Sequence, residues 1–154
     1  MIEIHLRAAR ADDVPAIVAL LADDVLGAAR EDVGDLAPYR EAFAEIDADS
    51  SEVLLVACRG DEVVGTLQVS LQRTLARGGA RRATIEAVRV AASARGMGLG
   101  EKMIRHAIAV TPDHGCTIVQ LTSDKSRVEA HRFYERLGFA RSHDGFKLFL
   151  GPSS

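Results

Sequence analysis

A glycine-rich segment in the second half of the chain places the strongest constraint on the fold. Gly96, Gly98 and Gly100 lie within five residues, directly after an apolar strand-like run and before a run with helical periodicity. Glycine adopts positive φ angles at little cost, so such a segment can turn several N–H groups toward one point. The start of the following helix adds partial positive charge, and Arg95 adds a full charge. The segment therefore predicts a strand–loop–helix unit that binds a phosphate-like anion.

The rest of the chain predicts a mixed α/β fold. Strand patterns cover 3–8, 52–58, 62–72, 82–90, 116–122 and 145–150, and helix patterns cover 12–21, 38–46, 98–110 and 126–137. The turn at Arg59-Gly60-Asp61 predicts a hairpin. Antiparallel strands followed by one strand–helix–strand crossover predict a mostly antiparallel sheet of six to seven strands flanked by helices. We expect one domain over 1–150 and a short tail at 151–154.

Composition and charge narrow the class of protein. The chain has 154 residues, of which 47% are hydrophobic, enough to bury a core. Its net charge of -3 argues against nucleic acid or an anionic membrane as the main partner. Cys58 and Cys116 lie in apolar runs, and no cysteine or histidine spacing matches a metal site, so we expect free thiols and no metal. No secretory signal or long apolar run is visible, which favours a cytoplasmic location.

Two well-known phosphate-binding loops fit this segment poorly. A dinucleotide-binding loop needs G-x-G-x-x-G and an acidic residue about 20 residues further on, whereas here the spacing is G-x-G-x-G and only Asp124 imitates the acid. A Walker loop needs Gly-Lys followed by Ser or Thr, which Gly100-Glu101-Lys102 does not supply. A glycine turn that serves only packing is the remaining alternative.

Three segments resemble the GNAT superfamily of N-acetyltransferases. Arg95-Gly96-Met97-Gly98-Leu99-Gly100 resembles its R/Q-x-x-G-x-G/A signature, and Ala130–Phe139 resembles its A-x-x-F-Y-x-x-x-G-F helix. Leu6–Asp13 resembles the R-x-A-x-x-x-D start, so the likeness spans nearly the whole chain in the right order. The resemblance implies a single-domain GNAT fold with acetyl-CoA as acetyl donor, whose pyrophosphate binds the loop. Many members carry Asn, which can contact the pantetheine arm, where this chain has Arg127.

The resemblance and the chemistry together suggest catalytic residues. A lysine-like amine is almost entirely protonated at pH 7, so its acetylation needs a base, a polarised thioester carbonyl and a proton for the leaving thiolate. Glu86 is the candidate base, and strand alternation places it on one face with Val88 and Val90. Backbone N–H groups near Val88 are expected to polarise the carbonyl, and Tyr134 is the candidate acid. The expected donor-binding residues are Val88, Val90, Arg95, Gly96, Met97, Gly98, Leu99 and Gly100.

These features predict acetyl transfer to the primary amine of a small molecule. Direct transfer in a ternary complex is favoured because neither cysteine lies in a nucleophile motif. The segment 23–37, expected to be a loop with a short helical turn, carries Asp23, Asp24, Glu31, Asp32 and Asp35. Such a rim favours a cationic amine, although a solvated loop explains it equally well. Acceptance of a protein or peptide amine and a non-catalytic acyl-CoA-binding module remain alternatives, and a homodimer stays open.

Overall fold

A five-stranded sheet organises the chain in the computed structural model, which describes residues 3–151. The strands are β1 (Ile4–Ala8), β2 (Glu52–Arg59), β3 (Glu62–Arg73), β4 (Arg81–Val90) and β5 (Cys116–Leu121). They lie side by side in sequence order. β1 to β4 pair antiparallel, whereas β5 runs parallel to β4, so the predicted mixed and mostly antiparallel sheet is confirmed. The predicted hairpin turn joins β2 and β3, with Gly60 at φ +62°.

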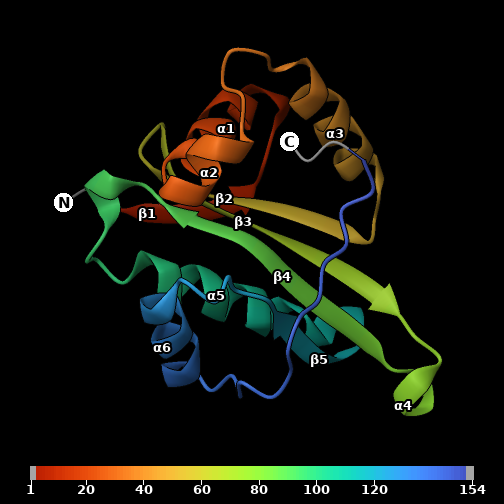
Figure 1. Ribbon diagram of the computed structural model, residues 1–154. Helices are drawn as coiled ribbons and strands as arrows, with labels where there is room; N and C mark the ends of the chain where they lie inside the picture. Colours follow the sequence, from red (N-terminus) through yellow and green to blue (C-terminus); the bar gives the residue numbers. More distant parts are fainter. Residues whose placement is uncertain (1–2, 152–154) are drawn as a thin grey trace.

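The predicted strand at 145–150 is wrong, and the sheet has five strands rather than six to seven. In this segment Phe146, Leu148 and Leu150 are 95%, 85% and 93% exposed. The chain runs in extended form from α6 toward α3 without entering the sheet (Figure 1). An apolar alternation gives strand propensity, but a strand also needs a partner for its backbone hydrogen bonds. Residues 152–154 of the expected tail lie outside the described residues.

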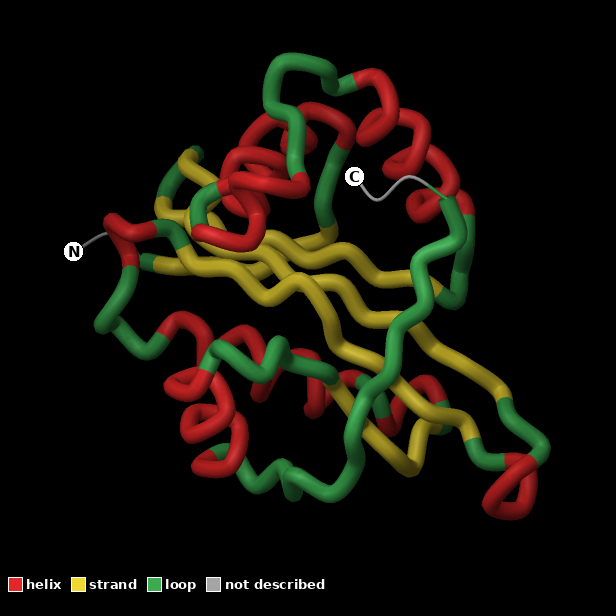
Figure 2. Tube along the Cα trace, viewed as in Figure 1, coloured by secondary structure: helices red, strands yellow, loops and turns green. Residues whose placement is uncertain are grey.

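Helices cover both faces of the sheet. They are α1 (Val14–Ala22), α2 (Val25–Arg30), α3 (Ala37–Ala48), α4 (Ala76–Gly79), α5 (Leu99–Val110) and α6 (Val128–Arg136), with short 3-10 turns η1 (Ala11–Asp13), η2 (Ala92–Ala94) and η3 (Pro112–His114). α1, α2 and α3 lie on one side, and α5 and α6 lie on the other (Figures 1 and 2). Among the described residues, no helix has the length and apolar character needed to span a bilayer.

The main core lies between α5 and the sheet. Leu99, Met103, Ile104 and Ala107 are all buried on one stripe of α5, close to the stripe that the sequence predicts. Gly65 of β3 lets the helix approach, because a Cβ at this position would lie 2.8 Å from Met103 Sδ. Close packing of α5 fixes the direction in which its N-terminus points, and therefore the position of the glycine-rich segment.

An ion pair fastens the end of β1 to the start of α1. The buried carboxylate of Asp13 accepts hydrogen bonds from the Arg7 guanidinium at 2.7 and 3.0 Å and from the Arg10 N–H at 2.7 Å. The hydrogen bonds from Arg7, aided by the Arg10 N–H, outweigh burial and lower the pKa of Asp13. The R-x-A-x-x-x-D pattern therefore has a structural role here: its two charged residues join β1 to α1.

Candidate active site

A β-bulge in β4 decides which side chains face each side of the sheet. Thr66 and Gln68 of β3 pair with Arg89 and Glu86, so β4 has one extra residue between these pairs. Ala87 lies in this bulge with φ +54°, a conformation uncommon for a residue other than glycine. One extra residue reverses the alternation of side chains along the rest of the strand.

The prediction that Glu86, Val88 and Val90 lie on one face of the strand is wrong because of this bulge. Val88 and Val90 pack against the α5 core, whereas Arg89 pairs with Asp24 beside α2 on the other side. Glu86 is exposed and, within residues 3–151, makes no hydrogen bond or ion pair. Its carboxylate is thus accessible from solvent, on the same face of the sheet as the Arg89 side chain.

Beyond the bulge, β4 has an open edge. Pairing with β5 ends at Ile85, whereas pairing with β3 continues to Val90. The N–H of Ala91 bonds to Val64 on β3, so strand alternation turns the N–H groups of Val88 and Val90 toward the open edge. This edge can hold a ligand by backbone hydrogen bonds, and it places the Val88 N–H next to the bulge.

The glycine-rich segment connects this strand to α5. Gly96 and Gly98 have φ of +81° and +73°, and Gly98 is the left-handed residue that begins the helix. The first helical hydrogen bond runs from Lys102 N–H to Gly98 O at 3.1 Å. The N–H groups of Leu99 and Gly100 therefore precede the helical ladder and are free to bind an anion at the helix N-terminus.

Arg95 lies beside the segment rather than over it. Its Nε donates to the Val90 carbonyl at 3.3 Å, and its guanidinium pairs with Asp23 at 3.7 Å at the end of α1. Both side chains of this pair are more than half exposed, 58% and 59%. Because exposed pairs contribute about 0–1 kcal/mol, a phosphate at the loop would compete well with Asp23 for the Arg95 guanidinium.

Tyr134 lies on α6, with its ring partly buried in an aromatic group. Its ring meets Phe133 at 5.2 Å and Phe139 at 6.0 Å between centroids, both edge-on. The inward orientation that the helix pattern predicts is confirmed. Burial raises the pKa of Tyr134, and the nearby Arg89 and Arg127 only partly oppose this effect. The phenol therefore carries its proton at neutral pH, and within residues 3–151 its hydroxyl has no hydrogen-bond partner.

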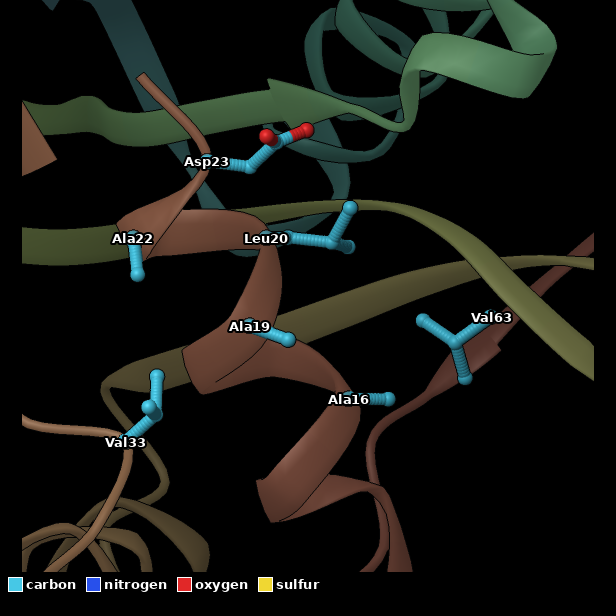
Figure 3. A pocket seen from close by; sticks show the side chains of 7 residues that line it. All are labelled: Ala16, Ala19, Leu20, Ala22, Asp23, Val33 and Val63. Carbon is cyan, nitrogen blue, oxygen red and sulfur yellow. The ribbon is translucent and has the colours of Figure 1, made fainter. Parts of the chain in front are cut away.

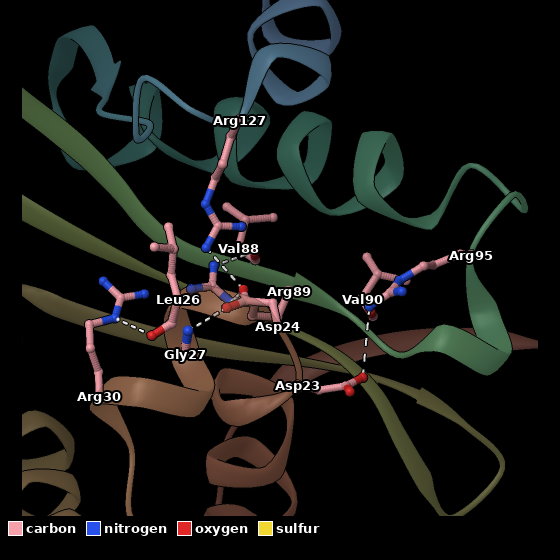
Figure 4. Close-up of polar contacts among 10 residues, drawn as sticks. All are labelled: Asp23, Asp24, Leu26, Gly27, Arg30, Val88, Arg89, Val90, Arg95 and Arg127. Carbon is pink, nitrogen blue, oxygen red and sulfur yellow. Dashed lines mark hydrogen bonds and ion pairs between the residues drawn. The ribbon is translucent and has the colours of Figure 1, made fainter.

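Asp24 joins three parts of the chain around the β4 bulge (Figure 4). One carboxylate oxygen caps α2 by accepting the Gly27 N–H. The other lies 2.9 Å from an Arg127 guanidinium nitrogen, at the start of α6, and 3.3 Å from Arg89 Nε. Hydrogen bonds from Gly27 and Arg127 outweigh burial, the largest single influence, and lower the pKa of Asp24. Arg127 thus helps to hold α6 against α2.

The other acidic residues of the segment that follows α1 also make local contacts. The Tyr39 hydroxyl donates to Glu31 at 3.0 Å, and the Asp32 and Asp35 carboxylates accept N–H groups of Gly34 and Ala37 at 2.9 and 3.2 Å. These contacts give the acidic residues a structural role in shaping the α1–α3 connection. A steering effect on a cationic amine stays a prediction.

Two hollows lie on the side of α1 and α3. An apolar cavity lies between these helices and the sheet, and its wall includes Phe43, Gln68 and the bulge residue Ala87. A second hollow is open, and Ala16, Ala19 and Asp23 are among the residues that line it (Figure 3). The first one adjoins the bulge and is therefore the better candidate for part of an acceptor site.

The structure connects several of the residues that the sequence singles out. Glu86 and Val88 flank the bulge residue Ala87, and the glycine-rich segment follows the end of β4. Tyr134 lies close enough to Arg89 of the same strand for electrostatic interaction. The pairing of Asp24, a member of the predicted acidic rim, with Arg89 and Arg127 was not expected, because no local pattern connects α2 with β4. Among the described residues, no group of three or more potential metal ligands occurs.

Comparison with known proteins agrees with this geometry. The sequence pattern of the acetyltransferase (GNAT) family matches residues 14–139. The chain is 27% identical over 146 residues to the aminoalkylphosphonate N-acetyltransferase of Salmonella typhimurium, covering 95% of this chain and 91% of that one. It is 37% identical over 82 residues, 53% of each chain, to the glucosamine 6-phosphate N-acetyltransferase of Trypanosoma brucei brucei.

A solved structure from Bacillus halodurans C-125, described as a transcriptional regulator, is 44% identical and superposes with a TM-score of 0.93. The superposition covers 96% of this chain and 100% of the Bacillus halodurans chain. The family match extends from α1 to the end of the α6 segment, and so includes the bulged strand, the glycine-rich loop and Tyr134. The chain therefore belongs to the GNAT family and is an acetyl-transferring enzyme.

Proposed function

We propose that this enzyme transfers the acetyl group of acetyl-CoA to the primary amine of a small molecule, directly and within a ternary complex. The bulge at Ala87 is the observation that carries the proposal. It turns the Val88 N–H to the open edge of β4 and leaves the Glu86 carboxylate exposed on the neighbouring face. A hydrogen-bond donor for a thioester carbonyl and a base for an amine thereby come from residues on either side of Ala87 in one strand.

Two groups of backbone donors hold the acetyl donor in this proposal. The N–H groups of the glycine-rich segment and of the first turn of α5 bind the pyrophosphate, with Arg95 turning toward it. The open edge of β4 binds the pantetheine arm through Val88 and Val90. Because backbone donors are fixed by the sheet and the helix, they need little reorganisation when the ligand binds.

Glu86 and Tyr134 then move the protons. Only about one lysine-like amine in a few thousand is unprotonated at pH 7, so a base that removes the proton raises the reactive fraction. Glu86 accepts this proton directly or through a water, the amine attacks the thioester, and the Val88 N–H stabilises the developing negative charge on oxygen. Tyr134, whose raised pKa keeps it protonated, supplies a proton to the departing thiolate.

The buried cysteines support direct transfer over a covalent acetyl-enzyme. Cys58 is 1% exposed and Cys116 is 8% exposed, so neither thiol is available to a substrate. The two acetyltransferases compared above act, by their names, on small molecules that carry an amine. A small-molecule acceptor is therefore favoured over a protein or peptide acceptor.

A regulatory role is the second candidate, because the Bacillus halodurans relative is described as a transcriptional regulator. In that case the chain would bind acyl-CoA and report it to a partner. The exposed Glu86 and the protonated Tyr134 favour catalysis, since binding alone requires neither group.

Calorimetry with acetyl-CoA, run beside desulfo-CoA, NAD and ATP, tests the donor site first. We expect both coenzyme A species to bind and NAD and ATP not to bind. A thiol-release assay with small amines and with peptides then tests transfer. Coenzyme A binding without thiol release from any amine would favour the regulatory role, and absence of coenzyme A binding would refute the donor site.

A further inference from the structure

Three arginines gather near the end of β4 and exceed the negative charge around them. Arg89 lies on β4, Arg127 lies at the start of α6, and Arg30 ends α2 on the same side (Figure 4). Asp24 pairs with Arg89 and Arg127, whereas Arg30 bonds only to the Leu26 carbonyl, at 3.2 Å. Asp124 also lies close enough to Arg127 and Arg30 for electrostatic interaction. With both carboxylates counted, positive charge still remains.

The hydrogen bonds of this cluster are incomplete. The Arg89 side chain is only 18% exposed, and its Nε is buried without a hydrogen-bond partner within the described residues, although Asp24 lies 3.3 Å away. Burial, followed by the neighbouring Arg127, lowers the pKa of Arg89, and Asp24 only partly opposes this effect. Within the described residues, the Arg89 guanidinium donates one hydrogen bond, from a terminal nitrogen to the Val88 carbonyl at 2.9 Å, which leaves further donors of this group for an anion.

The position of the cluster connects it with the reaction centre. Arg89 follows the bulge directly, two residues from Ala87, and its side chain shares a face with Glu86. Arg127 precedes the helix that carries Tyr134, and Tyr134 interacts electrostatically with both arginines. A molecule that presents its amine to Glu86 would therefore lie on the face of the sheet that carries the Arg89 side chain.

We propose that Arg30, Arg89 and Arg127 form an oxyanion subsite, and that the acceptor is a small amine carrying a phosphate or phosphonate group. This inference rests on the proposed function and specifies its acceptor. A phosphorus oxyanion fits better than a carboxylate, because it offers three oxygens and up to two negative charges to several guanidinium groups, and guanidinium forks bind such oxygens in pairs. The pyrophosphate of the donor has its own site at the start of α5.

Matched acceptors test the subsite. Thiol release is measured with an aminoalkylphosphonate and with the amino alcohol of equal chain length, and with glucosamine 6-phosphate and glucosamine. We expect a higher kcat/KM for the phosphorus-containing member of a pair, mainly through a lower KM. A β-amino acid serves as the carboxylate arm, and a preference for it over the phosphonate would overturn the choice of phosphorus.

Arg30→Gln is the first variant, because Arg30 is exposed and its loss leaves the Asp24 contacts intact. We expect the preference for the phosphonate over the amino alcohol to fall by about 10- to 100-fold, as for one charged hydrogen bond. Arg40→Gln, on the exposed surface of α3, makes the same change in charge and should keep the preference of the unmodified enzyme. Equal preferences in both variants would overturn the subsite.

Binding measurements separate the subsite from the proposed function. Calorimetry of the aminoalkylphosphonate is run on the coenzyme A complex of the enzyme and of both variants. Binding that Arg30→Gln weakens, without thiol release, would keep the subsite and refute acetylation. Equal thiol release with both members of each pair would refute the subsite and keep acetylation. Weaker acetyl-CoA binding in Arg30→Gln, with unchanged acceptor preference, would assign the arginines to the donor and overturn the inference.

Discussion

Replacing Gly98 with alanine tests whether the left-handed backbone at the start of α5 creates the donor site. Gly98 has φ +73°, and a Cβ built there finds no atom within 4 Å. The substitution therefore causes no clash, and its cost is conformational, about 1–2 kcal/mol for a left-handed residue with a side chain. For a domain of this size, this cost corresponds to a fall in Tm of about 2–8 °C.

The same substitution is expected to weaken acetyl-CoA binding. If the backbone relaxes to relieve the strain, the N–H groups beside it turn away from the pyrophosphate. Loss of one charged hydrogen bond costs about 1.5–3 kcal/mol, so the affinity should fall by about 10- to 100-fold. Thermal unfolding of the free enzyme and calorimetry with acetyl-CoA measure the two effects separately.

Gly100→Ala is the matched control. Gly100 lies in the first turn of α5, and a Cβ there would meet Phe133 Cζ at 3.5 Å and Val90 Cγ2 at 3.9 Å, ordinary contact distances. Alanine favours a helix over glycine by up to about 1 kcal/mol, so Tm should stay level or rise. The family signature also allows alanine at this position, and binding should change little. Normal acetyl-CoA affinity in Gly98→Ala, or an equal loss in both variants, would refute this account of the loop.

Three further predictions concern proton transfer and stability. Glu86→Gln should lower kcat by about 10²-fold or more near neutral pH and leave acetyl-CoA binding unchanged. The kcat of the variant should approach that of the unmodified enzyme as pH rises, because the free amine then accumulates. A loss of kcat that does not depend on pH would contradict the base role. Tyr134→Phe should slow thiol release while leaving the free energy of unfolding, from urea titration, within about 0.5 kcal/mol of the unmodified enzyme, since the hydroxyl has no partner within residues 3–151; wild-type rates would make Tyr134 structural. Asp13→Asn should destabilise the fold by about 1–3 kcal/mol at pH 7, because the Arg7 guanidinium loses its partner. The pKa of Asp13 is lowered in the fold, so its contribution is complete above the unfolded value near 3.9 and disappears as pH falls through the lower folded value. Urea titrations of both proteins at pH 7 and pH 3 should show this difference shrink.

Local patterns were enough to predict the elements near the donor site. The glycines at 96, 98 and 100 predict the strand–loop–helix unit, since positive φ and a helix start depend on neighbouring residues only. The apolar stripe of α5 and the inward position of Tyr134 follow from helical periodicity in the same way. These features involve short-range hydrogen bonds and side-chain spacing, which a single segment specifies.

Local patterns could not predict the boundaries of α2, or whether the C-terminal segment forms a strand, because both depend on contacts between distant segments. Asp24 caps α2 and also pairs with arginines on β4 and α6, so several elements share one carboxylate. The predicted strand at 145–150 lacks a paired neighbour in the structure, and its alternation alone could not reveal this.

The sequence by itself indicated the family, the glycine-rich loop and the identity of the candidate acid and base. Only the tertiary structure decided which way these residues face. The bulge at Ala87 arises from the pairing register of β3 and β4, and it moves Arg89 to the face of Glu86 while Val88 joins the α5 core. The alternation of side chains along one strand cannot reveal a bulge, because a residue is extra only relative to the strand with which it pairs. For the same reason the arginine cluster, built from three separate elements, became visible only in the folded chain.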